Sequence, residues 1–171
     1  MRFGAGQVAG ALGMTHQALG HLTRKLIARK PPGYHYRYGC GEVLWLACYR
    51  HARAAGLESA PAELFIGSPG MHLMLEELLT LAAPNPGEAV QRLRTIPILY
   101  GARYRFSEED HENELRGEPL LLEAQRLSQK LAEPCAAAGG AGVERLTVFA
   151  TPLAAPLNIL DRVIRENSNA A

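Results

Sequence analysis

The most informative stretch of the chain covers residues 5–26 and reads AGQVAGALGMTHQALGHLTRKL. Its first eight residues place the larger apolar side chains on one side of a short helix, and Gly13 is a typical residue to end such a helix. Thr15 can cap a second helix with its hydroxyl. That helix is predicted over residues 16–26, where apolar side chains recur three and four positions apart. The stretch therefore predicts two helices joined by a tight turn.

A basic and aromatic segment follows these helices. Residues 31–33 (PPG) end the helical region, and the alternating aromatic run at 34–38 (YHYRY) predicts a strand. A third helix is predicted over residues 42–55, ended by Gly56. Helix, turn, helix, basic loop, strand and helix is the order of a helix-turn-helix that carries a wing.

Charge is divided unevenly along the chain. Residues 1–57 contain eight basic side chains and one acidic side chain, Glu42, which gives a net charge of +7. Residues 58–171 contain ten basic and sixteen acidic side chains, a net charge of −6, and the two parts add to the +1 of the whole chain. This asymmetry predicts a basic module that meets a polyanion and an acidic module with another role.

Three segments form an ordered motif: QVAxxLGMT at 7–15, GYHYRY at 33–38, and EVxxL at 42–46 followed by YRHARAAGL at 49–57. In this order they resemble the DNA-binding domain of MerR-type regulators and of their excisionase-like relatives. The resemblance covers residues 6–57, about a third of the chain. It implies a winged helix-turn-helix that binds duplex DNA, with dimers being usual among MerR-type regulators.

The first residues of the second helix are expected to reach base edges in the major groove, where a glutamine can bond adenine. Basic residues behind them would neutralise phosphates, and a wing arginine could enter the minor groove. The predicted DNA-binding residues are Thr15, His16, Gln17, His21, Arg24, Lys25, Arg29, Lys30, Tyr34, His35 and Arg37. Two alternatives stay open: His16 and His21 as ordinary surface histidines, and Tyr36 or Tyr38 as buried residues.

The rest of the chain is predicted to be a linker at 58–70 and an acidic, mainly helical domain with minor β structure at 71–171. Helices are expected over 71–82, 88–94 and 156–166, and within 107–133. Strands are expected over 96–106 and 144–151. The predicted fold class is therefore mostly α, with a winged helix-turn-helix domain at 1–57 in front of a small helical domain.

A second wing-like segment lies at 94–110, RTIPILYGARYRFSEED. It resembles the wing of excisionase-type domains and the chain's own residues 33–42. A second, degenerate winged helix at about 72–116 is therefore one prediction, with a second DNA-binding patch at Arg92, Arg94, Arg103 and Arg105. A structural or partner-binding domain is the alternative.

Catalytic signatures are lacking: the chain contains no GxSxG, HExxH or P-loop motif. The three cysteines, Cys40, Cys48 and Cys135, form neither a CxxC pair nor an even set, which indicates reduced thiols in a cytoplasmic protein. No apolar stretch reaches the length of a membrane span. We therefore predict no enzyme activity, no cofactor, no metal and no membrane partner.

The function predicted from the sequence is sequence-specific binding of double-stranded DNA by a MerR-like transcriptional regulator. A homodimer or another protein partner is expected to use residues 71–171, with apolar stripes at 120–131 and 157–164 as candidate faces. The alternative is a phage or mobile-element factor, similar to excisionases or small terminase subunits, that recruits a partner enzyme. A third hypothesis is an enzyme with an unrecognised site in residues 58–171.

Overall fold

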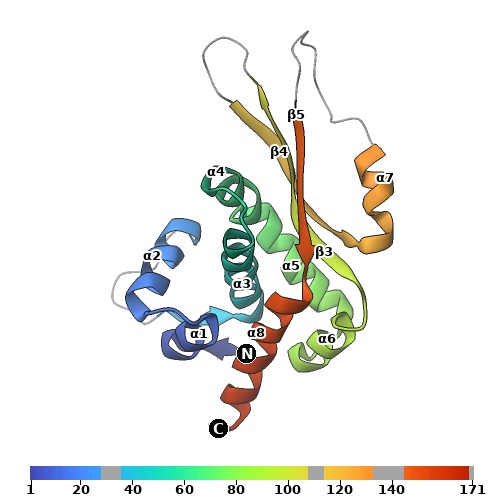
Figure 1. Cartoon of the computed structure of the whole chain (residues 1–171). Coiled ribbons are helices and arrows are strands. Elements are labelled where there is room, and N and C mark those ends of the chain that lie inside the picture. Colours follow the sequence, from blue (N-terminus) through green and yellow to red (C-terminus); the bar gives the residue numbers. More distant parts are fainter. Residues whose placement is uncertain (28–35, 108–113, 133–144, 170–171) are drawn as a thin grey trace.

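Helices make up most of the structure, a computed structural model that describes residues 1–27, 36–107, 114–132 and 145–169 (Figure 1). The helices are α1 Ala5–Leu12, α2 His16–Leu26, α3 Cys40–Ala54, α4 Ser59–Pro61, the π-helical turn η1 Ala62–Ile66, α5 Pro69–Ala82, α6 Pro86–Leu93, the 3-10 turn η3 Ala124–Arg126, α7 Leu127–Ala132 and α8 Ala154–Asn169. The strands are β1 Arg2–Phe3, β2 Tyr38–Gly39, β3 Ile98–Ser107, β4 Glu114–Glu123 and β5 Arg145–Pro152. The predicted mostly helical class is confirmed.

The two N-terminal helices lie where the sequence predicts them. Gly13 ends α1 in the left-handed conformation, with φ of 59°, which a glycine adopts without strain. The Thr15 hydroxyl accepts a hydrogen bond from the Ala18 amide at 3.2 Å and so begins α2. Local sequence signals therefore account for this helix pair.

The strand after α2 is shorter than predicted and has a partner that the sequence did not reveal. Only Tyr38 and Gly39 form β2, which pairs antiparallel with β1 so that Phe3 faces Tyr38. Both of these aromatic side chains are buried. Of the other predicted strand residues, Tyr36 and Arg37 are not part of a strand, and Tyr34 and His35 lie outside the described part of the chain.

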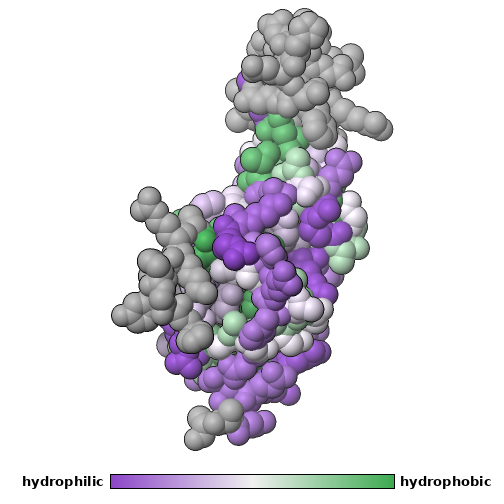
Figure 2. All heavy atoms as spheres, turned by 90° about the vertical axis from the view of Figure 1, so that its left-hand side faces the viewer, coloured by the Kyte–Doolittle hydropathy of each residue, from purple (hydrophilic) through white to green (hydrophobic). Residues whose placement is uncertain are grey.

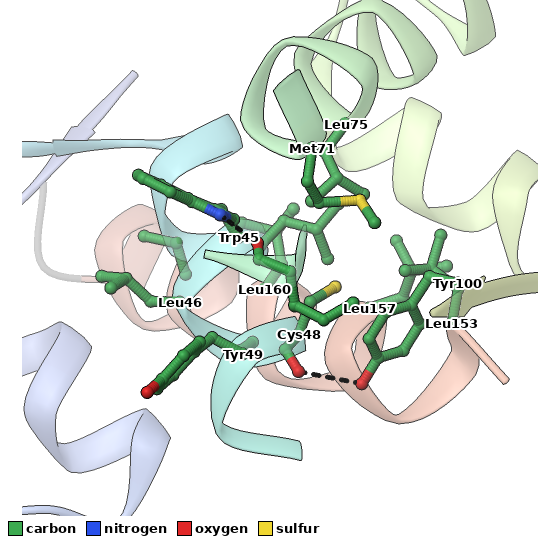
Figure 3. Packing of buried hydrophobic residues seen from close by; sticks show 14 of the residues in the cluster. Trp45, Leu46, Cys48, Tyr49, Met71, Leu75, Tyr100, Leu153, Leu157 and Leu160 are labelled. Carbon is green, nitrogen blue, oxygen red and sulfur yellow. Dashed lines mark hydrogen bonds between the residues drawn. The ribbon is translucent and has the colours of Figure 1, made fainter. Parts of the chain in front are cut away.

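Helix α3 lies at the centre of the fold and is apolar on nearly every side, as is typical of a helix surrounded by others (Figure 1). The Trp45 indole donates a hydrogen bond to the Ile66 carbonyl at 2.6 Å, and the Tyr100 hydroxyl donates to the Cys48 carbonyl at 3.0 Å (Figure 3). These bonds connect α3 to η1 and to β3. Gly56, with a positive φ of 97°, follows the end of α3, where the sequence predicted that the helix ends.

Residues 58–70, predicted as a linker, belong to the core. They form α4 and η1, and Ala62, Phe65 and Ile66 are buried against α3 and β3. Phe65 stacks on Tyr104, with ring centroids 5.8 Å apart. The apolar residues that looked like an isolated patch are therefore the link between the two halves.

One continuous hydrophobic core runs through the described chain, from Phe3 to Ile164. Helix α8 packs against both α1 and α3, and its Leu157 and Leu160 lie beside α3 side chains in Figure 3. Helix α8 therefore shares one core with α1 and α3, and the predicted division into domains at 1–57 and 71–171 stays a prediction.

A three-stranded antiparallel sheet, in the order β4-β3-β5, extends beyond the helices (Figure 1). Strands β3 and β5 agree with the predicted strands. The prediction of helices through 107–133 is wrong for residues 114–123, which form β4 and pair with β3 over ten residues. Side-chain spacing at Leu120 and Leu121 favoured a helix, but pairing with a distant strand outweighs local preference.

The predicted second winged helix stays a prediction. Residues 69–123 do run helix, helix, strand and strand, as such a domain would, in α5, α6, β3 and β4. That order by itself defines no function. Whether the four predicted arginines could bind DNA depends on their exposure and on their ion pairs, which are described below.

Candidate nucleic-acid interface

Helix α2 is fixed to the body by one side. Leu19 and Thr23 are buried, and the Thr23 hydroxyl donates to the Leu19 carbonyl at 2.8 Å while lying 2.7 Å from the Tyr38 hydroxyl. Burial raises the pKa of Tyr38, so this hydroxyl stays protonated and available as a donor. This contact connects α2 to β2, although no sequence signal linked Thr23 with Tyr38.

The turn between α1 and α2 is held from α3. The Arg50 guanidinium donates to the Gly13 carbonyl at 3.1 Å, across 37 residues of sequence. In the sequence, Arg50 belongs to the basic set of residues 1–57 and to the motif at 49–57. Its place on α3, three residues before Arg53, gave no sign of this supporting role.

The opposite side of α2 is exposed and carries most of the predicted base-reading residues. His16, Gln17, His21 and Arg24 are all exposed. The Arg24 guanidinium lies 3.0 Å from His21 Nδ1. Since arginine can only donate, His21 Nδ1 accepts and the neutral ring carries its proton on Nε2. The outer face of α2 thus offers an amide, imidazoles and a guanidinium, with no acidic group on the helix.

The molecular face that holds α1 and α2 is shown in Figure 2, where hydrophilic side chains cover much of the surface. Gly20 of α2 is half-buried, and a Cβ at this position would meet nothing within 4 Å. The backbone of α2 is therefore open to a close partner at this point.

We expect Gly20→Ala to stabilise the protein by about 1 kcal/mol, because alanine has a higher helix propensity and nothing occupies the space. Urea denaturation followed by circular dichroism measures the change. Gly13→Ala is the matched control and should destabilise, since φ is positive there. Equal effects of the two substitutions would contradict the conformations of these glycines.

Lys25 faces the body. Its ammonium lies 2.5 Å from Glu63 on η1, and the Ser59 hydroxyl donates to the same carboxylate at 2.8 Å. The hydrogen bonds from Lys25 and Ser59 lower the pKa of Glu63, and the bond to Glu63 raises the pKa of Lys25. The charge of Lys25, predicted to contact phosphate, is therefore compensated within the protein.

The wing residues are only partly described. Arg37 is exposed, and its carbonyl accepts a hydrogen bond from the Arg2 guanidinium at 3.1 Å. The predicted contacts Arg29, Lys30, Tyr34 and His35 lie outside the described residues.

Glu42 has a structural role at the start of α3. Its carboxylate accepts from the Gly39 amide at 2.7 Å and from the half-buried Tyr36 hydroxyl. Burial and this carboxylate both raise the pKa of Tyr36. The one acidic residue of the first 57 is therefore bound locally, and Tyr36 is turned toward it.

The second predicted basic patch is not brought together as one exposed surface. Arg92 pairs with Glu88 at 2.5 Å, and Arg94 pairs with Asp161 of α8 at 3.1 Å. Arg103 is buried, lies 3.4 Å from a Glu118 carboxylate oxygen and donates to the Lys130 carbonyl. The side chain of the fourth member, Arg105, is outside the described set. These arginines connect α6 to α8 and β3 to β4 and α7.

Other chemistry has little support in the described residues. No group of three or more potential metal ligands occurs among them. Burial raises the pKa of both the Cys40 and the Cys48 thiol, which disfavours reactive thiolates. A cavity of about 380 Å³ next to Cys40 and Glu76 and a groove of about 680 Å³ between Met74 and β4 hold no such cluster. Within the described ranges, no helix is long and apolar enough to cross a bilayer.

Comparison with known protein families, with curated proteins and with solved structures found no match for this chain. The resemblance of residues 6–57 to MerR-type domains thus rests on the ordered motifs in the sequence.

Proposed function

We propose that the protein is a sequence-specific DNA-binding protein, in which α2 enters the major groove and the chain serves in transcriptional regulation. The observation that carries this proposal is the outer face of α2. It is free of acidic residues, exposed over Gln17, His21 and Arg24, and mounted rigidly by its buried side. A helix of this kind fits the major groove of B-DNA.

Charge supports the same proposal. The first 57 residues carry a net charge of +7, and Glu42 is bound by Gly39 and Tyr36. Phosphate contacts dominate the affinity of proteins for DNA, so this net positive charge favours a polyanionic partner. The ion pair of Lys25 with Glu63 compensates one of these positive charges.

Some of these residues would contact DNA bases and others the DNA backbone. Gln17, in the first turn of α2, can form two hydrogen bonds with adenine, and His21 can donate from Nε2. Arg24, two turns further along the helix, would contact phosphate. Arg37, just before β2, is exposed and would contact phosphate or the minor groove.

The test uses the full chain and a pool of random duplex DNA. We expect selection of a preferred sequence, and a steep loss of affinity between roughly 50 and 200 mM salt. Gln17→Ala should lower discrimination between selected and random duplexes about 10-fold or more. Arg24→Ala should reduce the salt slope by about one, whereas Lys25→Ala should leave the slope nearly unchanged because Glu63 already neutralises Lys25.

Matched controls are available on the far side of the molecule. Gln129 and Arg126 are exposed residues of α7 and η3, which lie opposite α2 in Figure 1. Gln129→Ala and Arg126→Ala should leave both sequence preference and salt slope unchanged. Affinity that does not depend on salt, or a preference that Gln17→Ala leaves intact, would remove α2 as the reading helix.

A further inference from the structure

Strand β5 forms one edge of the long sheet, and its free side can be derived from the hydrogen-bond pattern. The Leu153 amide donates to the Ile98 carbonyl at 2.9 Å, one step beyond the opposed pair Leu99 and Pro152. Opposed residues in antiparallel strands alternate between bonded and non-bonded pairs. Counting back in steps of two, residues 151, 149 and 147 bond to β3, whereas 150, 148 and 146 direct their N–H and C=O groups to the free edge.

The opposite edge, β4, is protected against pairing. The Ala124 amide donates to the Pro97 carbonyl at 2.7 Å, so the same counting directs residues 115, 117, 119, 121 and 123 outward. Pro119 has no N–H in the middle of this series, and β4 contains the charged residues Glu114, Arg116, Glu118 and Glu123. Proline and charge are the usual means by which an edge strand avoids a second chain.

Strand β5 has such protection only at its two ends, where Arg145 begins it and Pro152 ends it. From Leu146 to Thr151 it reads LTVFAT, without charge and without proline, and its residues are typical strand formers. In the described part of the chain, β5 is the last strand of its sheet and has no strand on its outer side. The outer halves of β3, β4 and β5 also extend beyond the helical body (Figure 1).

We infer that β5 pairs with β5 of a second copy of this chain, antiparallel about a two-fold axis at Val148. In this register Val148 opposes Val148 of the second copy, and Leu146 opposes Ala150. Each of the three opposed pairs exchanges two backbone hydrogen bonds, so all outward N–H groups of residues 146, 148 and 150 are used. The two sheets become one sheet of six strands.

The symmetry of β5 favours a second copy over another extended chain. In this pairing the uncharged run 146–150 lies opposite itself, so no charged residue of one copy faces a charged residue of the other. Thr147 then opposes Phe149 of the second copy. A β-branched side chain opposite an aromatic one stabilises a sheet. The single charge of β5, Arg145, lies at its end, and the two copies of it are about 20 Å apart.

Cysteine cross-linking tests the register directly. Opposed residues in a bonded pair have Cα atoms about 5.5 Å apart, which suits a disulfide. Val148→Cys should therefore give a covalent dimer under mild oxidation. Ala150→Cys should not, because its two copies would lie roughly 14 Å apart. The unaltered chain, with its native cysteines, is the control. Cross-linking by Ala150→Cys but not by Val148→Cys would overturn the proposed register.

Sedimentation of the full chain without DNA tests the interface, so its outcome is independent of the proposed function. We expect a dimer for the unaltered chain and for Val148→Thr, which retains the N–H group. Val148→Pro should give a monomer that still folds, because the lost N–H does not bond to β3. Val148→Lys should weaken the dimer at least 10-fold by opposing like charges. A monomeric unaltered chain at about 100 μM, or a dimer that survives Val148→Pro, would refute the proposal.

Discussion

Gly101→Ala is expected to destabilise the protein by at least about 3 kcal/mol. A Cβ on Gly101 would overlap the Phe149 carbonyl oxygen and lie 2.8 Å from its carbon and 2.9 Å from the Ala150 Cα. All of these atoms belong to the backbone of β5, so no side-chain rotation can relieve the overlap. The substitution must force β3 and β5 apart. Urea denaturation of the full chain measures the loss as a lower midpoint.

The neighbouring position provides the control. Phe149→Ala should not restore the stability lost in Gly101→Ala, because the obstructing atoms belong to the backbone. Unchanged stability of Gly101→Ala would mean that β3 and β5 lie further apart than described here.

Removal of α8 is expected to unfold α1 and α3 and, with them, to abolish the DNA binding proposed above. Leu157, Leu160, Val163 and Ile164 are buried, and α8 packs against both α1 and α3. A chain that ends at Leu153 leaves the apolar sides of these helices exposed to water. Leu160→Ala alone should cost about 2–5 kcal/mol, because its side chain is completely buried.

Circular dichroism and proteolysis of the truncated chain measure the loss of structure. Asn158→Ala, at an exposed position of α8, is the matched control for Leu160→Ala and should have little effect on stability. The same packing predicts that residues 1–57 alone do not form a stable domain. A folded, DNA-binding fragment of residues 1–57 would contradict the role assigned to α8.

The candidate interface illustrates how far local sequence reaches. The bounds of α1 and α2, the αL glycine between them and the Thr15 cap agree with the prediction, because helix periodicity and capping depend on residues within one or two turns. The exposed row of Gln17, His21 and Arg24 follows from the same periodicity. The contacts that hold α2 in place could not be predicted in this way. Arg50 bonds to Gly13, and Tyr38 contacts Thr23, and both come from distant positions in the sequence.

Sequence alone was thus sufficient for the mostly helical class, for the bounds of α1 and α2 and for the charge asymmetry. Three features depended on contacts between distant residues. Residues 114–123 became a strand because β3 offers ten paired positions, and residues 58–66 became core because η1 fills the space between α3 and β3. The charge of Lys25 is compensated because η1 places a Glu63 carboxylate oxygen 2.5 Å from the Lys25 ammonium. Strand pairing, burial and ion pairing all require knowledge of which distant segments meet, and a local pattern does not contain it.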